Sequence, residues 1–513
     1  MTKFIEFNRK LFFLLCIFFS LYCIKFYDGS KTIFIIYNFF VIYLSYYLTC
    51  KSSSFFSFFL AFYIFMGFWL KYNFSLSFYA GNVYDSGILR ASNIDDVLLI
   101  SIYIFLTIII GNFISKKIFF YKKKNYNINY NFFYNIYLSN KNSILILFIF
   151  LFLFTGLTNF YLKLYIKGMI FENNYNFWIL SLMKWMILFG FTSFSCFILH
   201  KETLSKNKKI ILFFLIAFFE IFISYTSMLS RAIVLVGIPF MYAIIFYENI
   251  FNDFNKKYFF VIAIFFTFTF TSVYLVNKER ISLINKLKED YRKEMEIKKN
   301  NKTLNKIDNK KYLTSEKFYS KKITPKNWSA KEDNVNFAAK EDNVKHMSSF
   351  IMINRWVGID SLINVSSSNK LSFEMFFKAF KEKKRKIGNT FYEENFNLGH
   401  TKTSFHHKKT YLRGNTLPGL FSFLYYSGNL CFVIIFIFLL VLFFNYLEKK
   451  LFLISNGNLF FLAFIFNSIV NRFFSFGYAP ADTYLFIISL ILSVFLIYLL
   501  ESSFLDKILI KLK

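Results

Sequence analysis

Long apolar runs are the feature that most constrains how this chain can fold. A helix needs roughly 20 mostly apolar residues to cross a bilayer. Twelve segments come close to that length, near residues 11–27, 32–49, 54–70, 97–115, 143–161, 177–199, 210–226, 232–250, 259–277, 420–447, 458–474 and 483–500. Only 18% of the residues are charged, and these are bunched between the runs. The pattern excludes soluble globular classes and predicts an all-α polytopic membrane protein with about 12 transmembrane helices.

Lys and Arg in the short connections predict the orientation, because positive charge is retained on the cytoplasmic side. These residues are concentrated in 1–10, 116–142, 200–209 and the other connections that share a side with the N-terminus. Twelve spans then place both termini in the cytoplasm. The first apolar run follows a short basic start and has no small-residue cleavage site, so we expect it to be a retained span.

The same topology divides the chain into three regions. Residues 1–277 form a nine-span membrane region, residues 278–416 form one large loop on the outer face between spans nine and ten, and residues 417–513 form a three-span region. Within the loop, residues 348–365 are apolar enough to lie on the membrane or to pack against the bundle. Residues 371–386 combine Phe with Lys, which predicts a basic amphipathic helix suited to an anionic interface.

Several kinds of chemistry are unsupported by the sequence. The net charge of +31 would suggest nucleic acid in a soluble protein, but membrane topology accounts for it here, and we expect no nucleic-acid partner. The five cysteines have no metal-ligand spacing, which argues against a disulfide framework and a zinc site. The chain contains no Walker loop, G-x-G-x-x-G, H-E-x-x-H or D-x-D pattern, so we expect no nucleotide, metal or other cofactor.

Arginine is scarce, and most of it falls on the predicted outer side. Eight of nine arginines lie there or in the outer part of a span, namely Arg90, Arg231, Arg280, Arg292, Arg355, Arg385, Arg413 and Arg472. A guanidinium is a planar, permanently charged, bidentate donor that suits phosphate or pyrophosphate. Arg292 and Arg385 read as ordinary loop charges. The acid or base candidates on this face are Asp85, Asp95, Asp96, Asp360, His400, His406, His407 and Asp482.

Four short segments carry a family resemblance. They are SMLSRA at 227–232, NRWVGID at 354–360, LPGLFSFLYYSG at 417–428 and FGYAP at 476–480. With the many spans and the large late loop, they resemble the Wzy-type O-antigen polymerases, also called oligosaccharide repeat unit polymerases. Gly358, Gly419 and Gly428 within these segments are expected at turns or in tight packing.

The resemblance implies a transferase in the bacterial inner membrane, with residues 278–416 as a periplasmic loop. Such an enzyme joins oligosaccharide units carried on undecaprenyl pyrophosphate into polysaccharide, and a chain-length regulator is a candidate protein partner besides the membrane lipids. It implies Arg231 and Arg355 as the clamp on the leaving pyrophosphate. Asp360 or His400 would be the base that activates the acceptor hydroxyl. Further substrate-binding candidates are Arg90, Arg280, Arg413 and Arg472.

Other classes remain open at this level. An O-antigen ligase shares the membrane setting and the lipid pyrophosphate donor but uses lipid A-core as acceptor. A lipid-linked oligosaccharide flippase or other transporter fits twelve spans, although the halves show no internal repeat and the chain has only 17 Gly and 4 Pro to break helices. A non-catalytic membrane assembly protein is a third class, disfavoured by the outer arginines.

Overall fold

The computed structural model describes most of the predicted membrane region. The described residues are 2–50, 54–78, 82–83, 87–88, 94–119, 132–166, 169–171, 177–204, 356–383, 390–396, 405–407, 410–412, 418–475 and 480–501, with 278–279, 282, 289 and 293. The three predicted spans at 210–226, 232–250 and 259–277 lie outside them.

Helices dominate the described residues. Those before the predicted loop are α1 (Thr2–Cys23), η1 (Ile24–Phe26), α2 (Lys31–Cys50), α3 (Phe55–Ile64), η2 (Phe65–Leu70), α4 (Lys71–Phe78), α5 (Ile94–Phe119), α6 (Phe132–Ser139), α7 (Lys141–Leu162), α8 (Phe177–Trp185), η3 (Met186–Gly190) and α9 (Phe191–Leu204). Those in and after it are α15 (Ile359–Ser366), α16 (Phe373–Phe380), α17 (Phe391–Asn395), α18 (Gly419–Tyr425), α19 (Leu430–Ile454), α20 (Leu459–Val470), η9 (Asn471–Ser475) and α21 (Pro480–Glu501). The segments η2, η3 and η9 are π-helical turns that continue their neighbouring α-helices.

Seven helices in the described residues are long and apolar enough to cross a membrane. They are Lys31–Thr49, Phe55–Phe78, Ile94–Phe119, Lys141–Leu162, Trp178–Glu202, Leu430–Ile454 and Thr483–Glu501. Each overlaps a predicted span, as expected for a polytopic membrane protein whose backbone must satisfy its hydrogen bonds within helices. The first predicted span coincides with α1, and the eleventh with the shorter apolar helix Leu459–Phe474. The total of twelve spans stays a prediction.

The predicted tenth span, 420–447, differs from the structure. The short helix α18 ends at Tyr425, a turn follows at 426–429, and α19 begins at Leu430. Two features stop the helix here. Gly428 has a φ of +66°, and the Asn429 side chain accepts a hydrogen bond from the Phe432 amide and caps the next helix.

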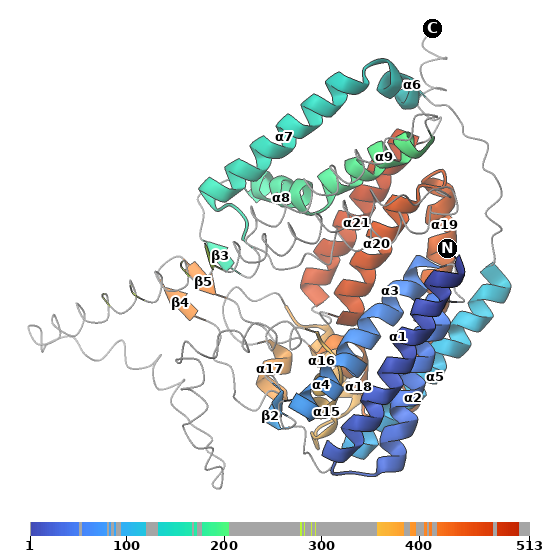
Figure 1. Ribbon diagram of the computed structural model, residues 1–513. Coiled ribbons are helices and arrows are strands. Elements are labelled where there is room, and N and C mark those ends of the chain that lie inside the picture. The colour runs from blue at the N-terminus through green and yellow to red at the C-terminus, as the bar shows by residue number, and fades with distance from the viewer. Residues whose placement is uncertain are drawn as a thin grey trace, which may run out of the picture. The chain divides into compact units, whose positions relative to one another are not determined.

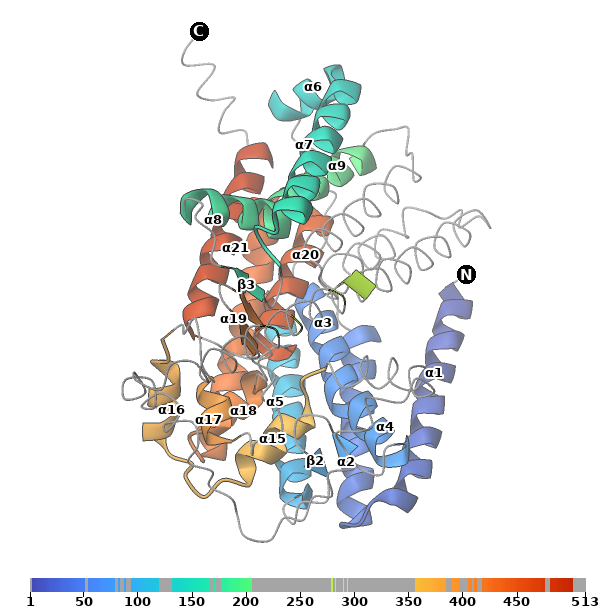
Figure 2. The same cartoon turned by 90° about the vertical axis from the view of Figure 1, so that its left-hand side faces the viewer.

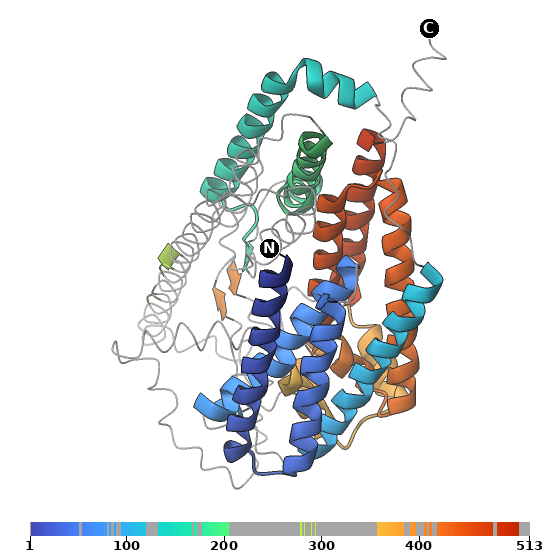
Figure 3. The same cartoon turned by 45° about the vertical axis from the view of Figure 1, so that its right-hand side comes forward.

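Helix α5 is central to the packing of the membrane helices. It packs against α2 on one side and runs along α19 on another (Figure 1). Gly111 of α5 lies where a Cβ would come within 3.2 Å of Val441 of α19, so the missing side chain permits the close approach. Helix α1 packs on α2 at the edge of this group (Figure 3).

The segments of the predicted outer loop gather together. Helix α15 packs against α18 and α5, and α16 packs against α18 (Figure 2). Two small antiparallel sheets accompany them. One pairs β1 (Asn82–Val83) with β2 (Gly87–Ile88), and the other has the order β3 (Met169–Phe171), β5 (Thr410–Leu412), β4 (Phe405–His407). Segments predicted to share one face therefore meet, although which face of the membrane they occupy stays a prediction.

The chain divides into two compact units. One comprises Met1–Val276 and Ile353–Lys513, and the other comprises Asn277–Met352. The predicted three regions, with a loop over 278–416, stay a prediction. Residues 353–416 group with the membrane helices rather than with the rest of the loop.

Candidate functional site

Two of the eight predicted site residues lie within the described part of the chain. Asp360 is the second residue of α15, and Arg472 is the second residue of η9. The others lie outside the described residues, namely Arg90, Arg231, Arg280, Arg355, His400 and Arg413. The site is therefore built around Asp360, next to the segment that contains Arg355.

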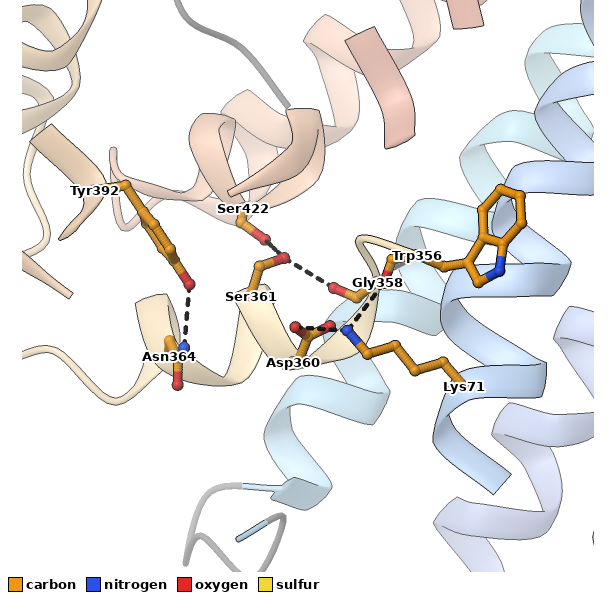
Figure 4. Close-up of polar contacts among 8 residues, drawn as sticks. All are labelled: Lys71, Trp356, Gly358, Asp360, Ser361, Asn364, Tyr392 and Ser422. Carbon is orange, nitrogen blue, oxygen red and sulfur yellow. Dashed lines mark hydrogen bonds and ion pairs between the residues drawn. The ribbon is translucent and has the colours of Figure 1, made fainter. Parts of the chain in front are cut away.

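Asp360 forms a buried ion pair with Lys71 (Figure 4). The Lys71 Nζ lies 3.0 Å from Asp360 Oδ2, and the two side chains are 2% and 4% exposed. The same ammonium donates a hydrogen bond of 2.9 Å to the carbonyl oxygen of Trp356. Lys71 thus holds both the backbone of Trp356 within the NRWVGID segment and the carboxylate at the end of that segment.

The π-helical turn η2 brings a transmembrane helix unusually close to this segment. A Cβ added at Gly67 would overlap the carbonyl oxygen of Val357, and one added at Gly358 would overlap that of Gly67. Two glycines therefore face each other with backbone against backbone. Because η2 ends at Leu70, it also delivers Lys71 to the same contact. π-Helical turns are frequent at functional sites.

The LPGLFSFLYYSG segment packs on the other side of α15. Ser361 Oγ lies 2.9 Å from Ser422 Oγ of α18 and donates to the carbonyl oxygen of Gly358 at 2.8 Å (Figure 4). Gly419 has a φ of +74°, and its Cα lies where a Cβ would come within 2.9 Å of Val357 Cγ1. The expectation that Gly358, Gly419 and Gly428 occupy turns or tight packing is confirmed.

A polar cluster links the site to η9. The Tyr63 hydroxyl receives a hydrogen bond of 2.7 Å from Asn471 Nδ2 and donates one of 3.1 Å to Asn467 Oδ1. All three side chains are buried, and the Tyr63 ring lies 5.8 Å from the ring of Trp356. Arg472 follows Asn471 directly and is half-buried.

The arrangement makes Asp360 a fixed carboxylate rather than a solvated one. Its Oδ1 is buried and has no hydrogen-bond partner among the described residues. A carboxylate whose other oxygen is paired with a buried ammonium is well suited to fixing the segment on the helices. Its predicted role as a base stays a prediction.

The other described acid candidates on this face are placed differently. Asp95 accepts hydrogen bonds from the Tyr27 hydroxyl and the Ser30 amide, so it ties the connection after α1 to the start of α5. Asp96 is exposed. The described residues contain no group of three or more His, Cys, Asp or Glu side chains that could hold a metal ion.

Sequence reasoning missed Lys71 and Tyr63. Lys71 follows the predicted third span directly, where a lysine reads as an ordinary flanking charge, and no local pattern marks its partner 289 positions later. Tyr63 lies inside a span rich in aromatic residues. The polar neighbours Asn467 and Asn471, four residues apart on one helix face, were the one available signal.

Together the fold and the site define a polytopic helical membrane protein with a loop segment anchored into its helices by a buried ion pair. Comparison with family models, with curated proteins and with solved structures gives no match.

Proposed function

We propose that this protein is a membrane glycosyltransferase that polymerises undecaprenyl-pyrophosphate-linked oligosaccharide repeat units into O-antigen or a similar surface polysaccharide. The reaction takes place at the periplasmic face of the bacterial inner membrane. The glycosyl pyrophosphate bond supplies the energy of the reaction, and the proposed mechanism uses neither a nucleotide nor a metal ion.

One observation carries the proposal. Two segments that resemble the Wzy-type polymerases lie apart in the sequence but pack together, with α15 against α18 through Ser361 and Ser422, and η9 packs against α18. The FGYAP segment follows η9 directly, and Arg355 directly precedes Trp356, whose carbonyl oxygen accepts a hydrogen bond from Lys71. The SMLSRA segment lies outside the described residues.

The chemistry assigned to these residues is a substitution at the anomeric carbon. A hydroxyl oxygen of the acceptor sugar forms a bond to that carbon, and the bond from the carbon to the pyrophosphate oxygen breaks. Undecaprenyl pyrophosphate departs with the electron pair, and Arg231 and Arg355 stabilise its charge. The arginines of the wider set, Arg90, Arg280, Arg413 and Arg472, contribute to holding the substrate.

The acceptor proton must pass to a base as the new bond forms. Asp360 and His400 are the two predicted bases. The buried ion pair with Lys71 favours a positioning role for Asp360, since this carboxylate already holds its segment against the helix that carries Lys71. We therefore assign the base to His400 and the anchoring of the Arg355 segment to Asp360.

Deletion of the gene in the source bacterium tests the proposal through the lipopolysaccharide banding pattern. A polymerase deletion reduces the ladder to core plus a single repeat unit. Complementation with the unaltered gene should restore the ladder, and Arg355→Ala should fail to restore it while still inserting in the membrane. Arg292→Ala is the matched control, because that arginine reads as an ordinary loop charge, and it should restore the ladder.

Other patterns would overturn the proposal in distinguishable ways. Polymer that accumulates on the lipid carrier with none on the core identifies a ligase. Loss of all O-antigen, with unpolymerised units retained in the cytoplasmic leaflet, identifies a flippase. An unchanged ladder removes the protein from this pathway.

A further inference from the structure

One face of helix α16 fixes it to the rest of the molecule. Met375, Phe376 and Ala379 are buried on this face. The Phe376 ring lies 5.3 Å from the ring of Phe423 in α18 and 5.2 Å from that of Phe432 in α19. The helix is therefore seated beside the first turn of a membrane-spanning helix.

A second face of α16 exposes three phenylalanines. Phe373, Phe377 and Phe380 are 43%, 54% and 42% exposed. Successive residues are roughly 100° apart around a helix, so these three rings form one stripe directly beside the buried face. An exposed stripe of large aromatic residues is costly in water.

A third face of α16 is charged. Glu374 and Lys378 form an exposed i,i+4 ion pair of 2.6 Å, and Lys381 is exposed beside them. The hydrogen bond and the charge of Lys378 lower the pKa of the Glu374 carboxyl. The order around the helix is thus a protein-facing stripe, then an exposed aromatic stripe, then a charged stripe.

The exposed aromatic stripe of α16 is contiguous with a row of exposed apolar side chains on α19. The Phe373 ring lies 5.3 Å from that of Phe432, which lies 5.8 Å from that of Phe436. On the same side of α19, the side chains of Ile435, Leu439 and Phe443 are 60%, 55% and 53% exposed. Since α19 is long and apolar enough to cross a membrane, these side chains form a belt that faces lipid.

We propose that the exposed stripe of α16 is immersed in the phospholipid bilayer where α19 enters it, with Phe373, Phe377 and Phe380 in the acyl boundary and Lys378 and Lys381 at the phosphates. The continuity with the α19 belt and the basic rim favour phospholipid over a protein partner. The sequence predicted an interfacial helix over 371–386. The structure adds which stripe enters the bilayer and at which end of α19.

Tryptophan substitution in the full-length chain tests this depth assignment. Phe377→Trp and Lys378→Trp introduce the probe at adjacent exposed positions on different stripes, and the native tryptophans give a common background. Each variant is reconstituted in nanodiscs of phosphatidylcholine and phosphatidylglycerol, with and without bromine on the upper acyl chain. Size-exclusion profiles that match the unaltered protein confirm folding.

We expect brominated acyl chains to quench most of the added fluorescence in Phe377→Trp and little of it in Lys378→Trp, with acrylamide in the aqueous phase giving the reverse order. Strong acrylamide quenching at both positions would place the stripe in water and overturn the proposal. If neither quencher reaches position 377, protein covers the stripe, either a second copy or another chain, and the lipid assignment is wrong. The result does not depend on the proposed polymerase activity.

Discussion

The main effect of the buried ion pair between Lys71 and Asp360 is to position the loop segment on the membrane helices. Removing two charges from water costs free energy that their mutual attraction barely repays, so such a pair adds little net stability. Its effect is to define one arrangement of the loop segment on the helices. Breaking the pair leaves a buried charge without compensation, whereas replacing both partners does not.

The first prediction concerns that asymmetry. We expect Lys71→Met and Asp360→Leu each to lower the free energy of unfolding by about 3–5 kcal/mol, and the double variant to be more stable than either single variant. Thermal unfolding of the detergent-purified protein measures all four chains. Losses that simply add in the double variant would show that the two residues act independently.

The facing glycines give the second prediction. Gly67→Ala and Gly358→Ala each force a methyl group into the backbone of the other segment, so we expect each to lower the free energy of unfolding by at least about 1–3 kcal/mol. Gly111→Ala is the control, because its methyl group would meet only the side chains of Val441 and Phe438, at 3.2 Å or more. Equal effects at all three positions in thermal unfolding would argue against a backbone contact at Gly67.

At the residue scale, sequence reasoning identified one partner and missed the other. Asp360 stood out because a carboxylate interrupts an apolar stretch, and Gly358 because glycine often marks close approach. Lys71 did not stand out, because Lys is abundant in this chain and flanks many of its spans. The pairing depends on a contact between distant segments, which hydropathy does not encode.

At the scale of elements, the N-terminus of α3 is capped by a side chain from another helix. Glu448 of α19 accepts hydrogen bonds from the Ser54 hydroxyl at 2.6 Å and from the Phe55 and Phe56 amides at 2.8 and 3.0 Å. A carboxylate at this position satisfies amides that have no partner inside the helix and complements the positive helix end. Ser54 adds its own cap by accepting from the Ser57 amide.

The third prediction is that Glu448→Ala frays the start of α3. Two buried amides lose their acceptor, so we expect a loss of about 1–3 kcal/mol in the free energy of unfolding. Hydrogen exchange at the amides of Phe55 and Phe56 should accelerate. Lys450 is an exposed residue two positions after Glu448 on α19, so Lys450→Ala should leave the hydrogen exchange of these amides unaltered. Unchanged protection in Glu448→Ala would exclude the capping role.

The presence of the membrane helices was easier to predict from the sequence than the residues at which they begin and end. Bilayer thickness sets the length of a spanning helix, so seven predicted spans coincide with seven apolar helices. The break between α18 and α19 was missed, because apolar side chains continue through Tyr425 and Tyr426 while only Gly428 and Asn429 mark the turn. The predicted amphipathic helix at 371–386 is shorter in the structure, where α16 ends at Phe380.

For the whole molecule, a second set of buried polar contacts joins the ends of α7, α9 and α21. Lys201 of α9 pairs with Glu501 of α21 at 2.5 Å, and both side chains are almost fully buried. Lys141 of α7 pairs with Glu202 at 2.6 Å, and Glu202 also accepts a hydrogen bond from the Tyr137 hydroxyl. These residues were predicted to share the cytoplasmic side, and the structure brings them together.

The fourth prediction tests how far the packing of α9 on α21 depends on the charges of Lys201 and Glu501. Lys201→Glu and Glu501→Lys each place like charges side by side in a buried position, so we expect each to reduce the yield of folded protein severely. The exchanged pair, which carries both changes, should recover part of that yield. Fluorescence-detected size-exclusion chromatography of the tagged chains measures it. Normal yields from the single variants would exclude a structural role for the pair.

At the molecular scale the sequence predicts a membrane protein and groups its segments by side, because both follow from hydropathy and charge. It leaves open whether residues 348–365 lie on the membrane or pack against the bundle, and it does not predict that the chain divides into two compact units between Met352 and Ile353. That division depends on apolar contacts such as Phe376 with Phe423 and on the backbone contact at Gly358, which arise only in the folded chain.

The most direct test of the central claim is polymerisation by the purified protein in liposomes. The substrate is the lipid-linked repeat unit extracted from the deletion strain, which supplies the correct sugars. We predict a ladder of multiples of the repeat unit on the lipid carrier, with release of undecaprenyl pyrophosphate, and no ladder from Arg355→Ala. Absence of multiples from correctly folded, unaltered protein, or transfer only to added lipid A-core, would contradict the account.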